Sequence, residues 1–148
     1  MPALMKFIHL LAAIAWLGGI GFMLLALRPA AAELLAPPQR LPLIAQVLQR
    51  FFALVWASIA LLFLTGLSML LSVGMKQAPV GWHLMLGLGL VMFALFGHLY
   101  FGPFRRLKQA VSAADWPEGG RRTGQIATLA GINLMLGVLA IGVVIFTI

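Results

Sequence analysis

The stretch "WHLMLGLGLVMFALFGHLYFGPFRR", Trp82–Arg106, decides the fold. No Asp, Glu, Lys or Arg occurs before its final arginine pair. About 20 apolar helical residues cross the hydrocarbon of a bilayer, and in lipid only a helix or a closed barrel satisfies its own backbone. We therefore predict a membrane helix over about 81–101. The same stretch contains His83 and His98, which is unusual for a helix that faces lipid.

The whole chain has the composition of a membrane protein. Of its 148 residues, 63% are hydrophobic and 9% are charged, and the mean hydropathy is +1.08. A soluble domain of this length does not need so much apolar surface. The chain has no cysteine, which excludes disulfides, thiolate metal sites, c-type haem attachment and cysteine nucleophiles. A metal or cofactor must therefore be held by His, Met, Asn, carboxylate or backbone groups.

Four apolar runs predict four membrane helices and hence an all-α bundle. They cover about 4–27, 43–73, 81–101 and 124–148. The first run is longer than the apolar core of a signal peptide, so we expect it to be retained. Linkers are expected over 28–42, which is rich in proline, over 72–80, and over the basic segment 103–123. Residues 1–148 are thus predicted to form a single integral membrane domain.

Lys and Arg are divided unevenly between the two ends of this bundle. Eight of the ten lie in the first and third linkers or at the start of the second helix: Arg28, Arg40, Arg50, Arg105, Arg106, Lys108, Arg121 and Arg122. Only Lys6 and Lys76 lie at the opposite end. Cytoplasmic loops collect Lys and Arg, so we predict a bacterial inner-membrane protein with both termini on the periplasmic side. The net charge of +7 then reflects topology, and no nucleic-acid partner is expected.

The three histidines fall at two depths. His9 and His83 are predicted near the outer ends of their helices, and His98 lies about 22 Å deeper than His83. One helix face carries His83, Gly87, Val91, Ala94 and His98. Small residues on such a face either pack helices closely or leave room for a bound group. We expect this face to line an internal cleft, with His9 and His83 approaching each other across it.

Other polar or soft side chains are few. Most of the eight methionines are expected to be packing residues, but Met5 lies one turn before His9, and thioether with imidazole suits Cu(I). Asn133, near the middle of the last run, is expected to hydrogen-bond another helix. The three carboxylates lie in linkers, which excludes acid–base chemistry by paired carboxylates inside the membrane.

Three segments resemble the copper-resistance-D (CopD-like) integral membrane family. They are "FIHLLAAIAWLGGIGFMLLALRPA" from Phe7, "QRFFALVWASIALLFLTGLSML" from Gln49 and "GWHLMLGLGLVMFALFGH" from Gly81. The residues that carry the resemblance are His9, Trp16, Gly18, Gly19, Arg50, Phe51, Phe52, Thr65, Gly66, Trp82 and His83. The resemblance covers nearly the whole chain and implies a small helical bundle in the bacterial inner membrane with a role in copper handling.

A more distant likeness is to the HemJ-type protoporphyrinogen oxidases. These are also small four-helix membrane proteins, with a helix 1 histidine and a haem, and His9 and His98 would match. The lysine that this family carries early in its third helix is absent here, as is its "FNE" signature. These two departures argue against the oxidase activity, while haem binding is left open.

Three functions are compatible with these patterns. In the first, copper handling, His9, His83 and Met5 form an outer metal site and His98 an inner one. In the second, histidines on facing helices hold haem b, and Arg50, Arg105 and Arg106 meet its propionates. In the third, the protein is a non-catalytic membrane scaffold. The expected partners are the lipid bilayer and a metal ion or haem, and the sequence also allows a homo-oligomer.

Overall fold

The computed structural model describes residues 2–147, and this part of the chain contains helices and no strand. The helices are α1 (Pro2–Phe22), α2 (Arg28–Leu34), α3 (Pro37–Val73), α4 (Val80–Leu99), α5 (Arg105–Ser112) and α6 (Trp116–Phe146). Two π-helical turns, Met23–Leu27 and Tyr100–Phe104, join α1 to α2 and α4 to α5 without a break. The result is four rods, each long and apolar enough to cross a membrane. The predicted all-α bundle of four spanning helices is confirmed.

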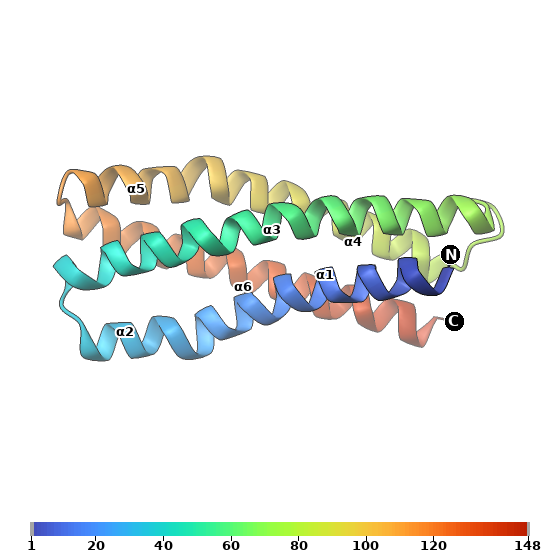
Figure 1. Ribbon diagram of the computed structural model, residues 1–148, viewed down its shortest axis with the longest axis horizontal. Coiled ribbons are helices and arrows are strands. Elements are labelled where there is room, and N and C mark those ends of the chain that lie inside the picture. The colour runs from blue at the N-terminus through green and yellow to red at the C-terminus, as the bar shows by residue number, and fades with distance from the viewer. Residues whose placement is uncertain (1, 148) are drawn as a thin grey trace.

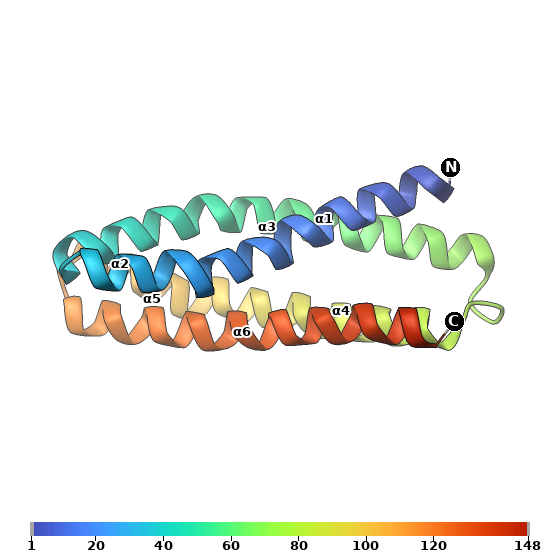
Figure 2. The same cartoon turned by 90° about the horizontal axis from the view of Figure 1, so that it is seen from below.

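The four rods lie side by side along the long axis of the molecule (Figure 1). Both termini lie at one end, together with the loop over 74–79, and we call this the terminal end (Figure 2). The two other connections, over 35–36 and 113–115, lie at the opposite end, which we call the basic end because eight of the ten Lys and Arg residues lie toward it. The most extensive packing is of α1 on α3 and of α4 on α6.

The expected proline-rich linker over 28–42 is mostly helix, which corrects the prediction. Pro37 begins α3, a position where a missing backbone N–H leaves no hydrogen bond unmade, whereas Pro29 lies in the first turn of α2, which continues the rod of α1. The π-helical turn Met23–Leu27 accommodates Pro29 within the rod. Only residues 35–36 interrupt the helix.

The expected basic linker over 103–123 is also mostly helix. Pro103 lies within the second π-helical turn, and the rod continues to Ser112. A short turn follows, in which Ala114 has a φ of +53°. The Asp115 carboxylate then caps α6 by accepting a hydrogen bond from the Glu118 N–H at 3.3 Å. The end of the expected linker, "DWPEGG" from Asp115, is therefore the cap and first turn of α6.

The rods are longer than the hydrocarbon layer is thick. With 37 residues, α3 extends about 55 Å at 1.5 Å per residue, against about 30 Å of hydrocarbon. Its apolar part lies toward the terminal end, so the surplus projects at the basic end. There Arg122, at the start of α6, is buried and its Nε donates to the Glu118 carboxylate at 2.5 Å.

Aromatic rings fill the centre of the bundle. Phe52 of α3 lies edge-on to Phe96 of α4, with ring centroids 5.1 Å apart, and to Phe104, with centroids 4.8 Å apart. Trp16 of α1 packs against the same cluster through Phe96. Large apolar side chains also cover the outside of the rods, for example Leu25, which is 82% exposed. An apolar surface on both sides of each helix is what a bilayer requires.

Candidate functional site

A cavity of about 390 Å³ lies between the rods in the terminal half of the bundle. All four rods contribute to its wall, which is almost wholly apolar. We call it the His9 cavity, because His9 is the only one of the three histidines that lines it. Other residues in its wall are Lys6, Ala13, Trp16, Gly66, Met69, Met85, Met92, Phe93 and Gly137.

His9 is held in one orientation by Thr65 across the α1–α3 contact. The His9 Nδ1 lies 2.8 Å from the Thr65 hydroxyl oxygen, and that hydroxyl lies 2.6 Å from the Leu61 carbonyl oxygen. A carbonyl oxygen can only accept, so the single hydroxyl hydrogen of Thr65 is donated to Leu61. The threonine oxygen must then accept from His9 Nδ1–H. In the neutral imidazole this leaves the Nε2 lone pair available to a ligand.

Gly66 makes room for this imidazole. A Cβ atom at position 66 would lie 3.2 Å from the His9 Cε1, tighter than an ordinary van der Waals contact. The adjacent pair Thr65–Gly66 therefore has two complementary effects: the hydroxyl orients the ring, and the missing side chain lets α1 approach α3.

Three thioether side chains share the cavity with His9. Met69 comes from α3, and Met85 and Met92 come from α4. These methionines were predicted as packing residues. The sequence does hold a signal for two of them, because Met85 and Met92 are seven residues apart and so lie on one helix face. Met69 cannot be found this way, since its place depends on how α3 is rotated against α4.

The helix face that carries His83 and His98 points away from the bundle. His98 and Ala94 are exposed, Val91 is 50% exposed and His83 is half-buried. The expectation that this face lines an internal cleft is wrong. α4 instead buries its opposite side, with Met92 and Phe96. Because α4 is apolar on every side, the small residues of this face do not specify by themselves which side packs inward.

The remaining predicted site residues lie outside the His9 cavity. Met5 is half-buried one turn from His9 on α1. Arg50, Arg105 and Arg106 are exposed on the basic half of the rods, and Arg105 lines a surface hollow on α5. Within residues 2–147 no three His, Cys, Asp or Glu side chains group as a metal site. A haem held by two histidines does not fit the His9 cavity, because a single histidine lines it.

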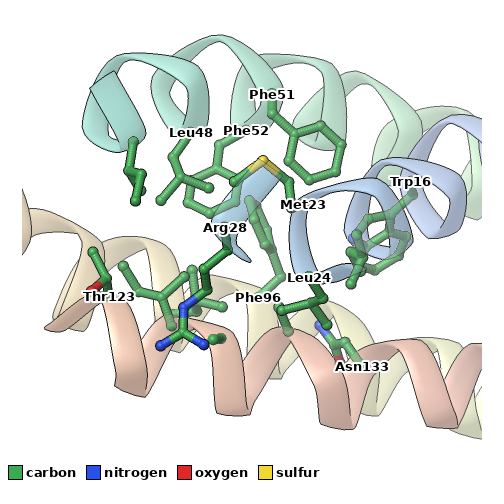
Figure 3. Close-up of a pocket in the computed structure, with 16 residues that line it drawn as sticks. Trp16, Met23, Leu24, Arg28, Leu48, Phe51, Phe52, Phe96, Thr123 and Asn133 are labelled. Carbon is green, nitrogen blue, oxygen red and sulfur yellow. The ribbon is translucent and has the colours of Figure 1, made fainter. Parts of the chain in front are cut away.

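A second, smaller cavity of about 40 Å³ lies toward the basic end (Figure 3). We call it the Asn133 cavity. Asn133 is 1% exposed, and its Nδ2 donates to the Met92 carbonyl oxygen at 3.2 Å. The predicted hydrogen bond from Asn133 to another helix is confirmed. Its Oδ1 is buried without a hydrogen-bond partner among the described residues.

Four spans around a histidine-bearing cavity define a small multi-pass helical membrane protein. The family model of copper resistance protein D (CopD) matches residues 45–147, which is more than half of the chain, and the chain belongs to the CopD family. The match includes Thr65 and the three cavity methionines, while His9 precedes it. No curated protein and no solved structure matches the chain. Family membership links this membrane protein to copper resistance.

Proposed function

We propose that the protein handles copper by holding Cu(I) in the His9 cavity. One observation carries the proposal. The Thr65 hydrogen bond leaves the lone pair of the His9 Nε2 available to a metal ion, and His9 lines a cavity that three thioethers also line. Copper is here the cargo of the protein rather than a resident cofactor. We propose further that the bilayer is the bacterial inner membrane and that the basic end faces the cytoplasm.

The donor set suits Cu(I) better than other abundant metal ions. Cu(I) is soft and prefers thioether and imidazole ligands, whereas Mg²⁺, Ca²⁺ and Mn²⁺ prefer carboxylate and carbonyl oxygens. No carboxylate lines the His9 cavity. A monovalent ion also carries less charge into an apolar wall than a divalent ion does. The residues present therefore favour copper in its reduced state.

Met5 and His83 have a secondary place in this proposal. Both are half-buried toward the terminal end, Met5 one turn before His9 and His83 next to the cavity residue Trp82. We assign them to the approach of the ion from the terminal side and not to the final site. His98 lies exposed in the other half of α4, and we assign it no role in copper binding.

A Cu(I) titration of the purified protein tests the proposal. In competition with a Cu(I)-selective chromogenic chelator, His9→Ala and Met85→Leu should each weaken binding by at least about 10- to 100-fold, the loss that follows when only an outer-shell partner of a metal ligand is removed. His98→Ala and Met135→Leu are matched controls, because His98 is exposed and Met135 is 74% exposed on α6. Both controls should bind as the parent protein does.

Two results would contradict the proposal. If His9→Ala and Met85→Leu bind Cu(I) as tightly as the controls, the His9 cavity is not the site. If the protein purifies red with a Soret band that His9→Ala removes, the cavity holds haem b instead. In that case the second axial ligand must be a group other than histidine, since no second histidine lines the cavity.

A further inference from the structure

The Asn133 cavity follows the inner face of α6 from the basic half of the bundle toward its middle. Arg28 and Thr123 line it at one end and Asn133 at the other, as Figure 3 shows. Asn133 lies nine positions after Gly124, which is beside the Arg28 guanidinium, and nine positions correspond to about 14 Å along α6. The cavity is therefore a narrow crevice rather than a round pocket.

The orientation of the Asn133 amide is fixed by its neighbour. The Met92 carbonyl oxygen only accepts, so the nitrogen of the amide must be the atom that faces it. The oxygen, Oδ1, is therefore the atom without a partner. A buried acceptor that makes no hydrogen bond is unfavourable and is commonly satisfied by ordered water. A crevice of about 40 Å³ has room for roughly two or three water molecules.

Arg28 supplies the second polar group of the crevice. Its Nη2 lies so close to α6 that a Cβ atom at Gly124 would be 3.9 Å away. Within residues 2–147 no carboxylate pairs with it. A guanidinium without a counterion keeps a hydration shell, because removing that shell is costly. Water can accept from Arg28 and donate to Asn133 Oδ1, whereas an anion could not satisfy the asparagine oxygen.

Trp16 lies between the Asn133 cavity and the His9 cavity. It lines both and is 2% exposed. Its ring stacks on Phe93, which lines the His9 cavity, with centroids 6.0 Å apart. It meets Phe96, which lines the Asn133 cavity, edge to face at 6.3 Å. The three rings thus form the wall between the two cavities.

We infer that the Asn133 cavity is a hydrated crevice open to the basic side, that it is the inner half of a path across the membrane, and that Trp16 closes this path against the His9 cavity. The evidence for the crevice is independent of which ion occupies the His9 cavity. Together the two cavities extend over much of the length of the bundle, with one aromatic wall between them.

Cysteine accessibility tests this inference directly, because the chain has no cysteine of its own. Ala130→Cys introduces a thiol in the Asn133 cavity, Ala13→Cys one in the His9 cavity, and Leu25→Cys one on the lipid face. A charged, membrane-impermeant thiosulfonate is added to sealed vesicles of either orientation. Only a thiolate reacts, and it forms only where water reaches, so Ala130→Cys should react about tenfold or more faster than Leu25→Cys, and only from the basic side.

Removing the aromatic wall should change the side of the membrane from which the reagent reaches the thiol. Combined with Trp16→Ala, Ala130→Cys should also react from the terminal side, whereas Trp16→Phe, which keeps a ring, should leave it closed. Ala45→Cys in the Trp16→Ala background shows whether the bundle has merely loosened, since Ala45 is buried and lines neither cavity, and its rate should stay low.

Three outcomes would overturn the inference. Ala130→Cys could react no faster than Leu25→Cys from either side, which would mean a dry crevice. It could react from the terminal side with Trp16 intact, which would mean that Trp16 is no barrier. It could also stay closed from that side in Trp16→Ala. None of these results depends on copper, so the inference can fail while the proposed copper site stands, and the reverse also holds.

Discussion

The imidazole of His9 and the hydroxyl of Thr65 lie 2.8 Å apart, although 56 positions separate them in the chain. The hydroxyl in turn donates to the Leu61 carbonyl oxygen one turn earlier on α3. These two hydrogen bonds set the tautomer of His9, because the Thr65 oxygen can only accept and the His9 Nδ1 must therefore carry the hydrogen. In the neutral imidazole the Nε2 lone pair is then not used by this hydrogen bond, and His9 lines the cavity.

Replacing Thr65 by Val should weaken Cu(I) binding by about tenfold or more, the usual effect of losing the group that orients a metal-binding histidine. Valine keeps the branched shape and removes the acceptor for His9 Nδ1–H. Thr65→Ser keeps the hydroxyl and should bind nearly as the parent protein does. Thr128→Val is the matched control, since Thr128 is exposed on α6 and bonds only the Gly124 carbonyl. Equal Cu(I) affinities for the valine and serine variants at position 65 would contradict this role.

Gly66→Ala should weaken Cu(I) binding without unfolding the bundle. The added Cβ would meet the His9 Cε1 at 3.2 Å, so the ring or α1 must shift by a few tenths of an ångström. Such a shift misaligns the Thr65 hydrogen bond. Gly87→Ala is the control, because a Cβ there would meet nothing within 4 Å. Binding and thermal melting of both variants should show a loss of affinity for Gly66→Ala alone.

The spans could be predicted from the sequence because their apolar content alone determines them. The segments around Pro29 and Pro103 could not, because a π-helical turn lets a proline continue a rod that the usual rule would end. The outward face of α4 was also mispredicted. A helix that is apolar all round carries no signal for which side packs inward, so the rotation of α4 depends on its contacts with α6.

Only part of the candidate site could be predicted from the sequence. His9 stood out as an ionisable group in an apolar run, and Thr65 was part of the family resemblance. That these two residues meet depends on the register of α1 against α3, which apolar patterns do not specify. Met69 belongs to the cavity through the rotation of α3 against α4, which the apolar patterns do not specify either. The unsatisfied Asn133 Oδ1 is a property of the packed bundle and leaves no trace in the sequence.

Both termini should lie on the periplasmic side. Eight of the ten Lys and Arg residues lie toward the basic end, which the positive-inside rule assigns to the cytoplasm. A periplasmic phosphatase fused after residue 147 should be active, and the same enzyme inserted at residues 113–115 should be inactive. A reporter that is active only in the cytoplasm should give the opposite pattern. Activity of the cytoplasmic reporter at the C-terminus would refute this topology.

Asn133→Leu should fold as well as the parent protein and should remove the water from the Asn133 cavity. Leucine is close to asparagine in size, so the α4–α6 contact can persist. The lost hydrogen bond to Met92 O costs about 0.5–1.5 kcal/mol, and burial of the apolar leucine side chain in place of the polar amide offsets this loss. We therefore expect the free energy of unfolding to change little.

The labelling of Ala130→Cys should respond to the same substitution. With Leu at position 133 the crevice loses its deepest polar group, so water has no partner there and the thiol should react as slowly as Leu25→Cys on the lipid face. Asn133→Gln keeps the amide and serves as the control, with labelling retained. Asn133 does not line the His9 cavity but donates to the Met92 carbonyl oxygen, so Cu(I) binding measured on both variants shows whether Met92 has kept its position. If Asn133→Leu leaves the labelling rate of Ala130→Cys unaltered, the water in the crevice does not depend on Asn133 Oδ1.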